Sequence, residues 1–131
     1  MNEHPKSGPP DIGRRTLAYS LRIIRLYREL QKDSVGRVLG MQLLRAGTSI
    51  GANVHEAQGA QSKMDFIAKI QIGYKEARES EYWVRLIGEA GLVSAARLKP
   101  LSDETNQLVR ILSSILITAK KAVRSSPRRG S

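Results

Sequence analysis

Apolar residues recur at helical spacing in four stretches of the chain, and no stretch shows the alternation of a strand. The first stretch spans residues 12–32. At 100° per residue, its apolar positions cover about 200° of the helix circumference, wider than the usual stripe of a surface helix. They form two adjoining rows: Leu17, Leu21, Ile24 and Tyr27, and Tyr19, Ile23, Leu26 and Leu30. So wide a face predicts association with another chain, because a monomer rarely leaves a large apolar patch exposed.

The next two stretches form a predicted helical hairpin. The second helix is expected over residues 34–58, with an apolar seam of Leu39, Leu43, Ala46, Ile50, Val54 and Ala57. A turn follows at 58–62, in which Gly59 is a candidate for the left-handed residue that ends a helix. Ser62 and Asp65 then resemble a capping box. They open a third helix that ends near Gly88 and Gly91 and has a seam of Phe66, Ile70, Gly73, Ala77, Ser80, Val84 and Ile87.

The fourth stretch contains Pro100. We expect a short helical turn from Ser94 that Pro100 interrupts, and a fourth helix that starts with Ser102 as its N-cap. Its apolar face comprises Leu108, Ile111, Leu112, Ile115, Leu116, Ala119 and Val123. Together the four patterns predict an all-α fold, an antiparallel up-down four-helix bundle over residues 12–124. Residues 1–11 and 125–131, rich in Pro, Ser, Gly and basic residues, are expected to be disordered.

A polar row runs beside the apolar seam of the second helix. In an antiparallel hairpin centred near Ala60, Arg45 lies at the level of Glu76, and Gln42 at the level of Glu79. We therefore predict a structural polar network in which an Arg–Glu pair fixes helix register. Its members are Gln42, Arg45, Ser49, Asn53, Glu56, Glu76 and Glu79. The alternative is a set of solvated surface charges.

The same region carries the most distinctive sequence of the chain. The stretches 42–57 and 75–83 contain an Arg, a Ser-Ile pair, an Asn-Val pair and a Glu, followed by two Glu and a Ser. These residues are Arg45, Ser49, Ile50, Asn53, Val54, Glu56, Glu76, Glu79 and Ser80. This pattern resembles the bacterial four-helix bundle protein family, also called the 23S rRNA-intervening-sequence protein family, over about residues 14–122. The resemblance implies a left-handed bundle and a ring-like homopentamer.

The residues needed for common catalytic and metal sites are absent from the sequence. There is no Cys and there are only two His, and no Glu-x-x-His motif of a di-iron bundle occurs. Neither a Ser-His-Asp set nor a phosphate-binding glycine loop is present. We therefore expect no catalytic residues, no metal and no cofactor, and a protein that is not an enzyme. Trp83, the only Trp, is expected to pack in the core or an interface, with base stacking as the alternative.

Positive charge is concentrated near the two ends of the chain. The formal net charge is +10, and residues 120–131 hold five basic and no acidic side chains. This asymmetry suggests a polyanionic partner, although a solubilising surface would look the same. The candidate nucleic-acid-binding residues are Arg15, Arg22, Arg25, Lys32, Lys120, Lys121, Arg124, Arg128 and Arg129.

Two functional hypotheses follow from the sequence. The first is a homo-oligomeric scaffold or adaptor that binds RNA or DNA weakly and with little sequence preference. It is favoured by the charge and by the resemblance to a family whose genes can lie inside ribosomal RNA genes. The second is a self-assembling or protein-binding structural protein with an unidentified protein partner. No apolar run is long enough for a membrane span and no signal-peptide core is present, so we expect a cytoplasmic protein without a membrane partner.

Overall fold

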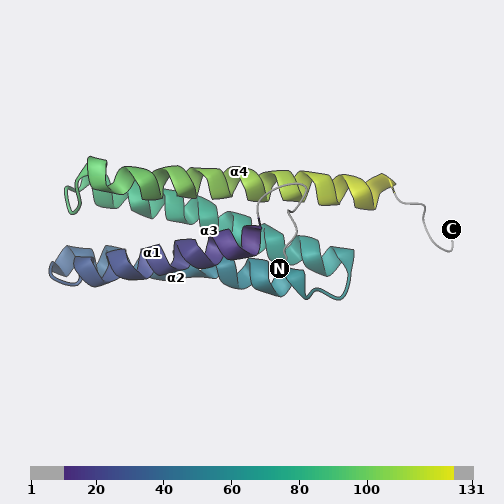
Figure 1. Cartoon of the computed structure of the whole chain (residues 1–131), viewed down its shortest axis with the longest axis horizontal. Coiled ribbons are helices and arrows are strands. Elements are labelled where there is room, and N and C mark those ends of the chain that lie inside the picture. Colours follow the sequence, from purple (N-terminus) through teal and green to yellow (C-terminus); the bar gives the residue numbers. More distant parts are fainter. Residues whose placement is uncertain (1–10, 126–131) are drawn as a thin grey trace, which may run out of the picture.

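The computed structural model describes residues 11–125 and consists of four long α-helices joined by short turns (Figure 1). Consecutive helices run antiparallel, and the described part of the chain contains no strand. The predicted all-α four-helix bundle is therefore confirmed. The helices are α1 (Ile12–Leu30), α2 (Ser34–Gln58), α3 (Lys63–Glu89) and α4 (Ala95–Ser125).

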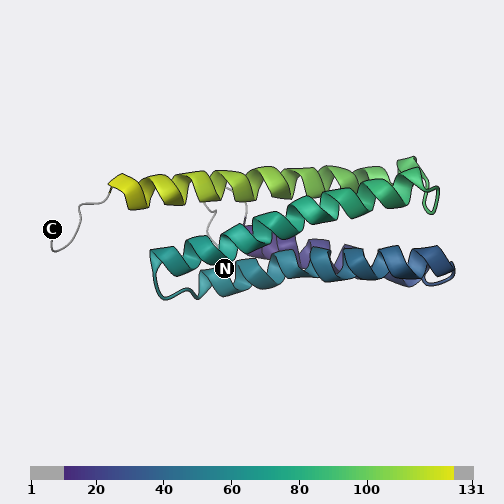
Figure 2. The same ribbon diagram turned by 180° about the vertical axis from the view of Figure 1, so that it is seen from behind.

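Helices that follow one another in the chain pack against one another, and the first and last helices approach each other at far fewer points. Figure 2 shows α3 running obliquely, from its start beside the end of α2 to its end beside the start of α4. α4 is the longest helix and extends beyond the start of α1 (Figure 1). The bundle is consequently least closed along the border between α1 and α4.

The core contains much of each apolar seam that the periodicity predicted, but not all of it. Several predicted seam residues are only partly buried: Leu39, Phe66, Ile111, Ile115, Ala119 and Val123. On α1 the row of Tyr19, Ile23, Leu26 and Leu30 is buried, whereas Leu17 and Leu21 of the other row are exposed. The other helices supply the rest of the core: Leu43, Ala46, Ile50, Val54 and Ala57 of α2, Ile70, Gly73, Ala77, Ser80, Val84 and Ile87 of α3, and Leu98, Leu101, Thr105, Leu108, Leu112 and Leu116 of α4. Leu98, Leu101 and Thr105 are core residues that the sequence pattern did not predict.

Short polar side chains begin three of the helices. Each accepts a hydrogen bond from an otherwise unpaired backbone N–H of the first turn. The Asp11 carboxylate accepts from Gly13 at 3.0 Å, that of Asp33 from Gly36 at 2.8 Å, and the Ser62 hydroxyl from Asp65 at 3.0 Å. The start predicted from Ser62 and Asp65 is thus the observed one.

The turn after α2 differs from the prediction. Gly59 has φ −103°, so the left-handed conformation predicted for it is wrong. Its N–H instead bonds the carbonyl oxygen of Glu56, which tightens the last turn and removes the need for a left-handed residue. The described glycine with positive φ is Gly91, at 77°, in the turn between α3 and α4.

The fourth helix begins earlier than the sequence predicted. It runs without interruption from Ala95 through Pro100, so the predicted start at Ser102 is wrong, and Ser102 lies inside the helix. The Ser94 hydroxyl accepts a hydrogen bond from the N–H of Arg97 at 3.3 Å and caps the helix in its place.

Pro100 is tolerated because it lies in the second helical turn. There it removes one hydrogen bond, the one that its nitrogen would donate to the carbonyl of Ala96, and an interior proline costs about 3 kcal/mol. Leu98 and Leu101, on either side of it, are buried in the core. Burying side chains of this size contributes about 1.5–3 kcal/mol each, enough to offset that cost.

Glycines bring α1 and α2 close together. Gly36, Gly40 and Gly47 are buried on the face of α2 that meets α1. A Cβ atom at Gly36 would lie 2.5 Å from the backbone oxygen of Leu30, and one at Gly47 would lie 2.9 Å from Cγ1 of Ile23. Side chains at these positions would therefore separate the two helices.

A buried hydrogen bond joins α1 to α4 across the core. The hydroxyl oxygens of Tyr19 and Thr105 lie 2.7 Å apart, and the Thr105 hydroxyl donates to the carbonyl of Leu101 at 2.8 Å. Burial raises the pKa of Tyr19 to about 12, because the phenolate would lose its hydration there. The folded state therefore favours the neutral form of this side chain.

We expect Tyr19→Phe to lower stability at neutral pH by about 1 kcal/mol, the net value of one buried hydrogen bond. In the wild type, the contribution of neutral Tyr19 is complete below its unfolded pKa near 10 and is lost as the pH rises through about 12. Urea unfolding at about pH 8 and about pH 11 gives the difference in free energy of unfolding between the wild type and Tyr19→Phe. This difference should be smaller at the higher pH. An equal difference at both pH values would contradict the raised pKa of Tyr19.

Candidate functional site

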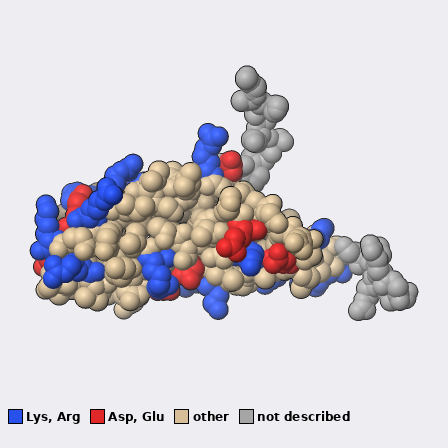
Figure 3. All heavy atoms as spheres, turned by 90° about the horizontal axis from the view of Figure 1, so that it is seen from below, with Lys and Arg blue, Asp and Glu red and all other residues tan. Residues whose placement is uncertain are grey.

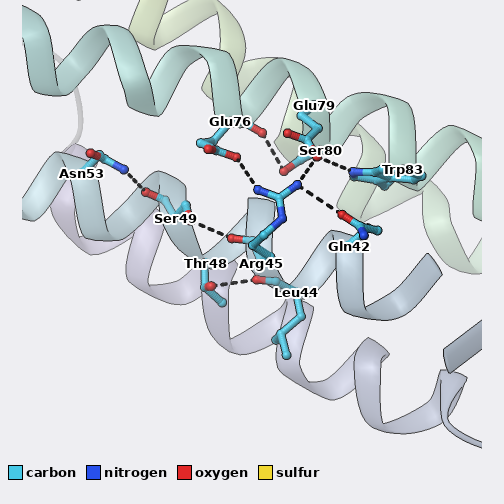
Figure 4. A network of polar contacts seen from close by, with 10 residues as sticks. All are labelled: Gln42, Leu44, Arg45, Thr48, Ser49, Asn53, Glu76, Glu79, Ser80 and Trp83. Atoms are coloured by element: carbon cyan, nitrogen blue, oxygen red, sulfur yellow. Dashed lines mark hydrogen bonds and ion pairs between the residues drawn. The ribbon is translucent and has the colours of Figure 1, made fainter. Parts of the chain in front are cut away.

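The Arg45 guanidinium lies between α2 and α3 and contacts three polar side chains (Figure 4). It donates to Glu76 at 3.4 Å and to Gln42 of its own helix at 3.3 Å, and it makes an ion pair with Glu79. The structure thus brings together Gln42, Arg45, Glu76 and Glu79, at the register that the antiparallel hairpin predicts. Arg45 is nevertheless half exposed, with 48% of its side chain accessible.

The other members of the predicted network face different partners. The Asn53 amide donates to the carbonyl of Ser49 at 2.9 Å, and the Ser49 hydroxyl donates to the carbonyl of Arg45 at 2.7 Å, so both bond their own helix. Glu56 pairs across the hairpin with Lys69 of α3 at 3.4 Å. Sequence reasoning missed Lys69, which lies about one helical turn farther from the turn near Ala60 than Glu56 does.

Trp83 and Ser80 complete this polar cluster from α3. The Trp83 indole donates to Glu79 at 2.8 Å, and the fully buried Ser80 hydroxyl donates to the carbonyl of Glu76 at 2.9 Å. Trp83 lies four residues after Glu79 on one helix face, a spacing that could have revealed the bond. Because its ring also packs against the core, Trp83 connects the cluster to the hydrophobic interior.

We expect Arg45→Ala to destabilise the protein by about 1 kcal/mol, because it removes a shared partner of two carboxylates but leaves them open to water. The melting temperature should fall by about 4 °C for a chain of this size. Arg85→Ala is the matched control: it breaks the exposed pair with Glu89 within α3 and should leave the melting temperature unchanged. Equal melting temperatures for both variants would mean that the Arg45 cluster contributes nothing.

Some of the candidate basic residues already bond other side chains of the protein, and others do not. Arg15 is held by Glu104 of α4, with Nε and Nη2 donating at 3.1 and 2.7 Å, and also donates to Gln107 at 2.9 Å. Lys120 donates to Gln71 at 3.3 Å. Arg15 is therefore already neutralised and is a poor candidate for binding phosphate.

The remaining candidates form two separate groups. Within residues 11–125, no carboxylate lies at ion-pair distance from Arg22, Arg25 or Lys32 near the end of α1, nor from Lys121 or Arg124 near the end of α4. Arg128 and Arg129 lie outside the described residues. Figure 3 shows basic side chains gathered at the end of the bundle where α1 meets α2.

The two groups lie at opposite ends of the bundle. Arg97, at the start of α4 and next to the first group, is separated from Lys121 by about 36 Å along the helix. One protomer therefore does not present them as one continuous stripe. Sequence reasoning missed Arg97, because Pro100 concealed the start of α4.

An apolar surface covers the outer face of α1 and α2. It contains Leu17 and Val38, each 63% exposed, and Leu21 and Met41, each about half exposed. Leu17 borders the same hollow as Thr48 and Ala52 of α2, so the outer rows of the two helices adjoin. Along the middle of this face, charged side chains are sparse (Figure 3). We call these residues, Leu17, Leu21, Val38 and Met41, the outer apolar face.

Neither a group of metal-ligating side chains nor a membrane-spanning helix is found among residues 11–125. Among residues 11–125, no three His, Cys, Asp or Glu side chains are grouped so that they could hold a metal ion. Within the same residues, none of the four helices has an apolar stretch of the length and hydropathy that a bilayer requires.

Comparison with known proteins identifies the family. The model of the 23S rRNA-intervening sequence protein family matches residues 11–114. Among solved structures, the chain is similar to a protein of unknown function from the S23 ribosomal protein family of Bacteroides thetaiotaomicron VPI-5482. The identity is 37% with a TM-score of 0.76, over 81% of this chain and 98% of that chain. A search of curated proteins finds no match. The family that the sequence resembles is thereby confirmed: the chain belongs to the 23S rRNA-intervening sequence protein family.

Proposed function

We propose that the protein is a non-enzymatic, homo-oligomeric helical scaffold that acts in the cytoplasm. The observation that carries the proposal is the outer apolar face. Leu17 and Val38 are nearly two-thirds exposed although they are large and aliphatic, and they lie on adjoining helices. Such a patch on a soluble chain usually marks a contact surface.

The proposed occupant of the outer apolar face is a second copy of this chain. Each copy has a net charge of +10, so two copies repel one another unless they meet where charges are sparse. The middle of the α1–α2 face meets this condition, whereas α3 carries five basic and five acidic residues between positions 62 and 93. A ring of five copies is the arrangement that the family resemblance implies.

The scaffold would bind RNA or DNA through its basic side chains. Phosphate contacts by Lys and Arg release counterions and give affinity without reading bases, and a ring multiplies the contacts of each copy. Scarce aromatic residues argue against stacking on single strands as the main mode. If nucleic acid is not bound, the scaffold would serve protein partners alone.

Light scattering at micromolar concentration tests the oligomer. A mass several times that of the 14.5 kDa chain is the expected result. A monomer would refute association, whereas a dimer or tetramer would refute only the number five.

A titration of labelled RNA and of duplex DNA tests nucleic-acid binding. We expect both to bind at low salt and to dissociate as the salt concentration rises. Removing residues 125–131, which include Arg128 and Arg129, should weaken binding and flatten its salt dependence. If neither nucleic acid binds at low salt, the charge serves solubility and the protein-only scaffold remains.

A further inference from the structure

A small hollow lies between the second half of α1 and the start of α4. Its volume is about 180 Å³, and its apolar wall is formed by Leu26, Val93, Leu98 and Leu101. Arg22 and Arg25 of α1 and Arg97 of α4 border it, together with Glu29. We call this hollow the arginine pocket. It is located on the border where α1 and α4 are least tightly packed.

Positive charge in the arginine pocket is only partly compensated. Glu29 accepts two hydrogen bonds from Nη2 of Arg97, at 2.8 and 3.0 Å. Arg22 and Arg25 have no ion-pair partner among residues 11–125. Three guanidinium groups thus face one carboxylate.

Arg22 is the unusual member of the set because it is partly buried. Arg15, two helical turns earlier on α1 and also partly buried, is neutralised by Glu104. Burying a charge is costly unless an opposite charge accompanies it. An anion bound from outside the chain would neutralise Arg22, as Glu104 neutralises Arg15.

We propose that the arginine pocket binds one phosphate group of a nucleic-acid strand, an inference that rests on the nucleic-acid part of the proposed function. Guanidinium groups bind phosphate through paired N–H donors, and several of them can share its oxygens. The hollow, with a volume of about 180 Å³, admits a group of the size of a phosphate. The apolar wall excludes water from one side and so strengthens the attraction.

Glu29 regulates this site by competition. It occupies Arg97 and lowers the positive potential that a phosphate would meet. A phosphate group must therefore share or replace this carboxylate. Glu29→Gln should raise the affinity for nucleic acid, an effect opposite in sign to that of every Arg substitution in the pocket.

The experiment compares pocket variants with variants of equal charge elsewhere. Arg22→Gln is matched by Arg110→Gln, an exposed residue of α4 outside the pocket. Glu29→Gln is matched by Glu89→Gln, since Glu89 is also exposed and paired with one arginine, Arg85. Labelled RNA is titrated at about 50 mM and about 200 mM salt, and circular dichroism verifies that each variant is folded.

We expect Arg22→Gln to weaken RNA binding by about tenfold and to lower the slope of log affinity against log salt by about one. Arg110→Gln should weaken binding by less than about twofold, because it changes only the long-range potential. Glu29→Gln should strengthen binding more than Glu89→Gln does. Equal effects of Arg22→Gln and Arg110→Gln, or of the two Glu variants, would overturn the proposal.

Inorganic phosphate separates failure of the pocket from failure of nucleic-acid binding. If the wild type binds no RNA, the nucleic-acid part of the proposed function is wrong, and the phosphate group bound by the arginine pocket does not come from RNA. Phosphate should still raise the melting temperature of the wild type more than that of Arg22→Gln, relative to sodium chloride at equal ionic strength. An equal rise in both proteins would show that the pocket does not bind phosphate at all.

Discussion

Replacing Leu17 or Val38 by Glu is expected to convert the proposed oligomer into monomers. Both side chains are 63% exposed in the single chain, so the fold does not depend on them. In an interface, however, each Glu would bury a carboxylate without a partner, which costs several kcal/mol for each copy. Light scattering should give the mass of one chain at concentrations where the wild type associates, and circular dichroism should remain unchanged.

Met64→Glu is the matched control for this experiment. Met64 is 64% exposed but lies at the start of α3, away from the outer apolar face. This variant should keep the mass of the wild type. Dissociation of all three variants would indicate a nonspecific effect of added charge, and association in all three would place the interface elsewhere.

Gly36→Ala is expected to lower stability by about 2 kcal/mol, although alanine favours helix formation more than glycine does. The added Cβ atom would lie 2.5 Å from the backbone oxygen of Leu30. Since that oxygen belongs to the last residue of α1 and accepts the N–H of Asp33 in the following turn, the turn itself would have to shift. The melting temperature should fall by about 8 °C. Gly47→Ala should act in the same direction, because its Cβ atom would meet the fully buried Ile23.

Gly73→Ala provides the control of opposite sign. Gly73 is also buried in a helix seam, but a Cβ atom there would lie 3.6 Å from Asn53, an ordinary contact. The gain in helix propensity, about 0.8–1 kcal/mol, should then appear as unchanged or higher stability. A loss in Gly73→Ala equal to that in Gly36→Ala would mean that flexibility, and not close approach, explains these glycines.

The sequence predicts which residues of α2 and α3 meet in the Arg45 cluster, but it does not predict how exposed the Arg45 side chain is. Counting outward from the turn near Ala60 places Arg45 opposite Glu76, because an antiparallel hairpin has one register once its turn is located. How much water reaches the guanidinium depends on the angle between α2 and α3 and on the neighbouring Trp83. Neither can be derived from a helical pattern.

The start of α4 illustrates how local signals can mislead. Pro100 and Ser102 favour a new helix at that point when each is considered alone. Leu98 and Leu101 reverse this preference because the core buries both side chains only if the helix is continuous. The same continuity places Arg97 beside Arg22 and Arg25, so the arginine pocket could not be found from the sequence.

Sequence alone determined that four amphipathic helices fold back on one another, since apolar spacing and turn residues act within short segments of chain. It also determined that α1 has more apolar surface than one core can use. The tertiary structure decided that Tyr19 and Ile23 face inward while Leu17 and Leu21 remain exposed. The physical reason is that periodicity defines the width of an apolar face, whereas the close approach of the α2 glycines selects which part of it is buried.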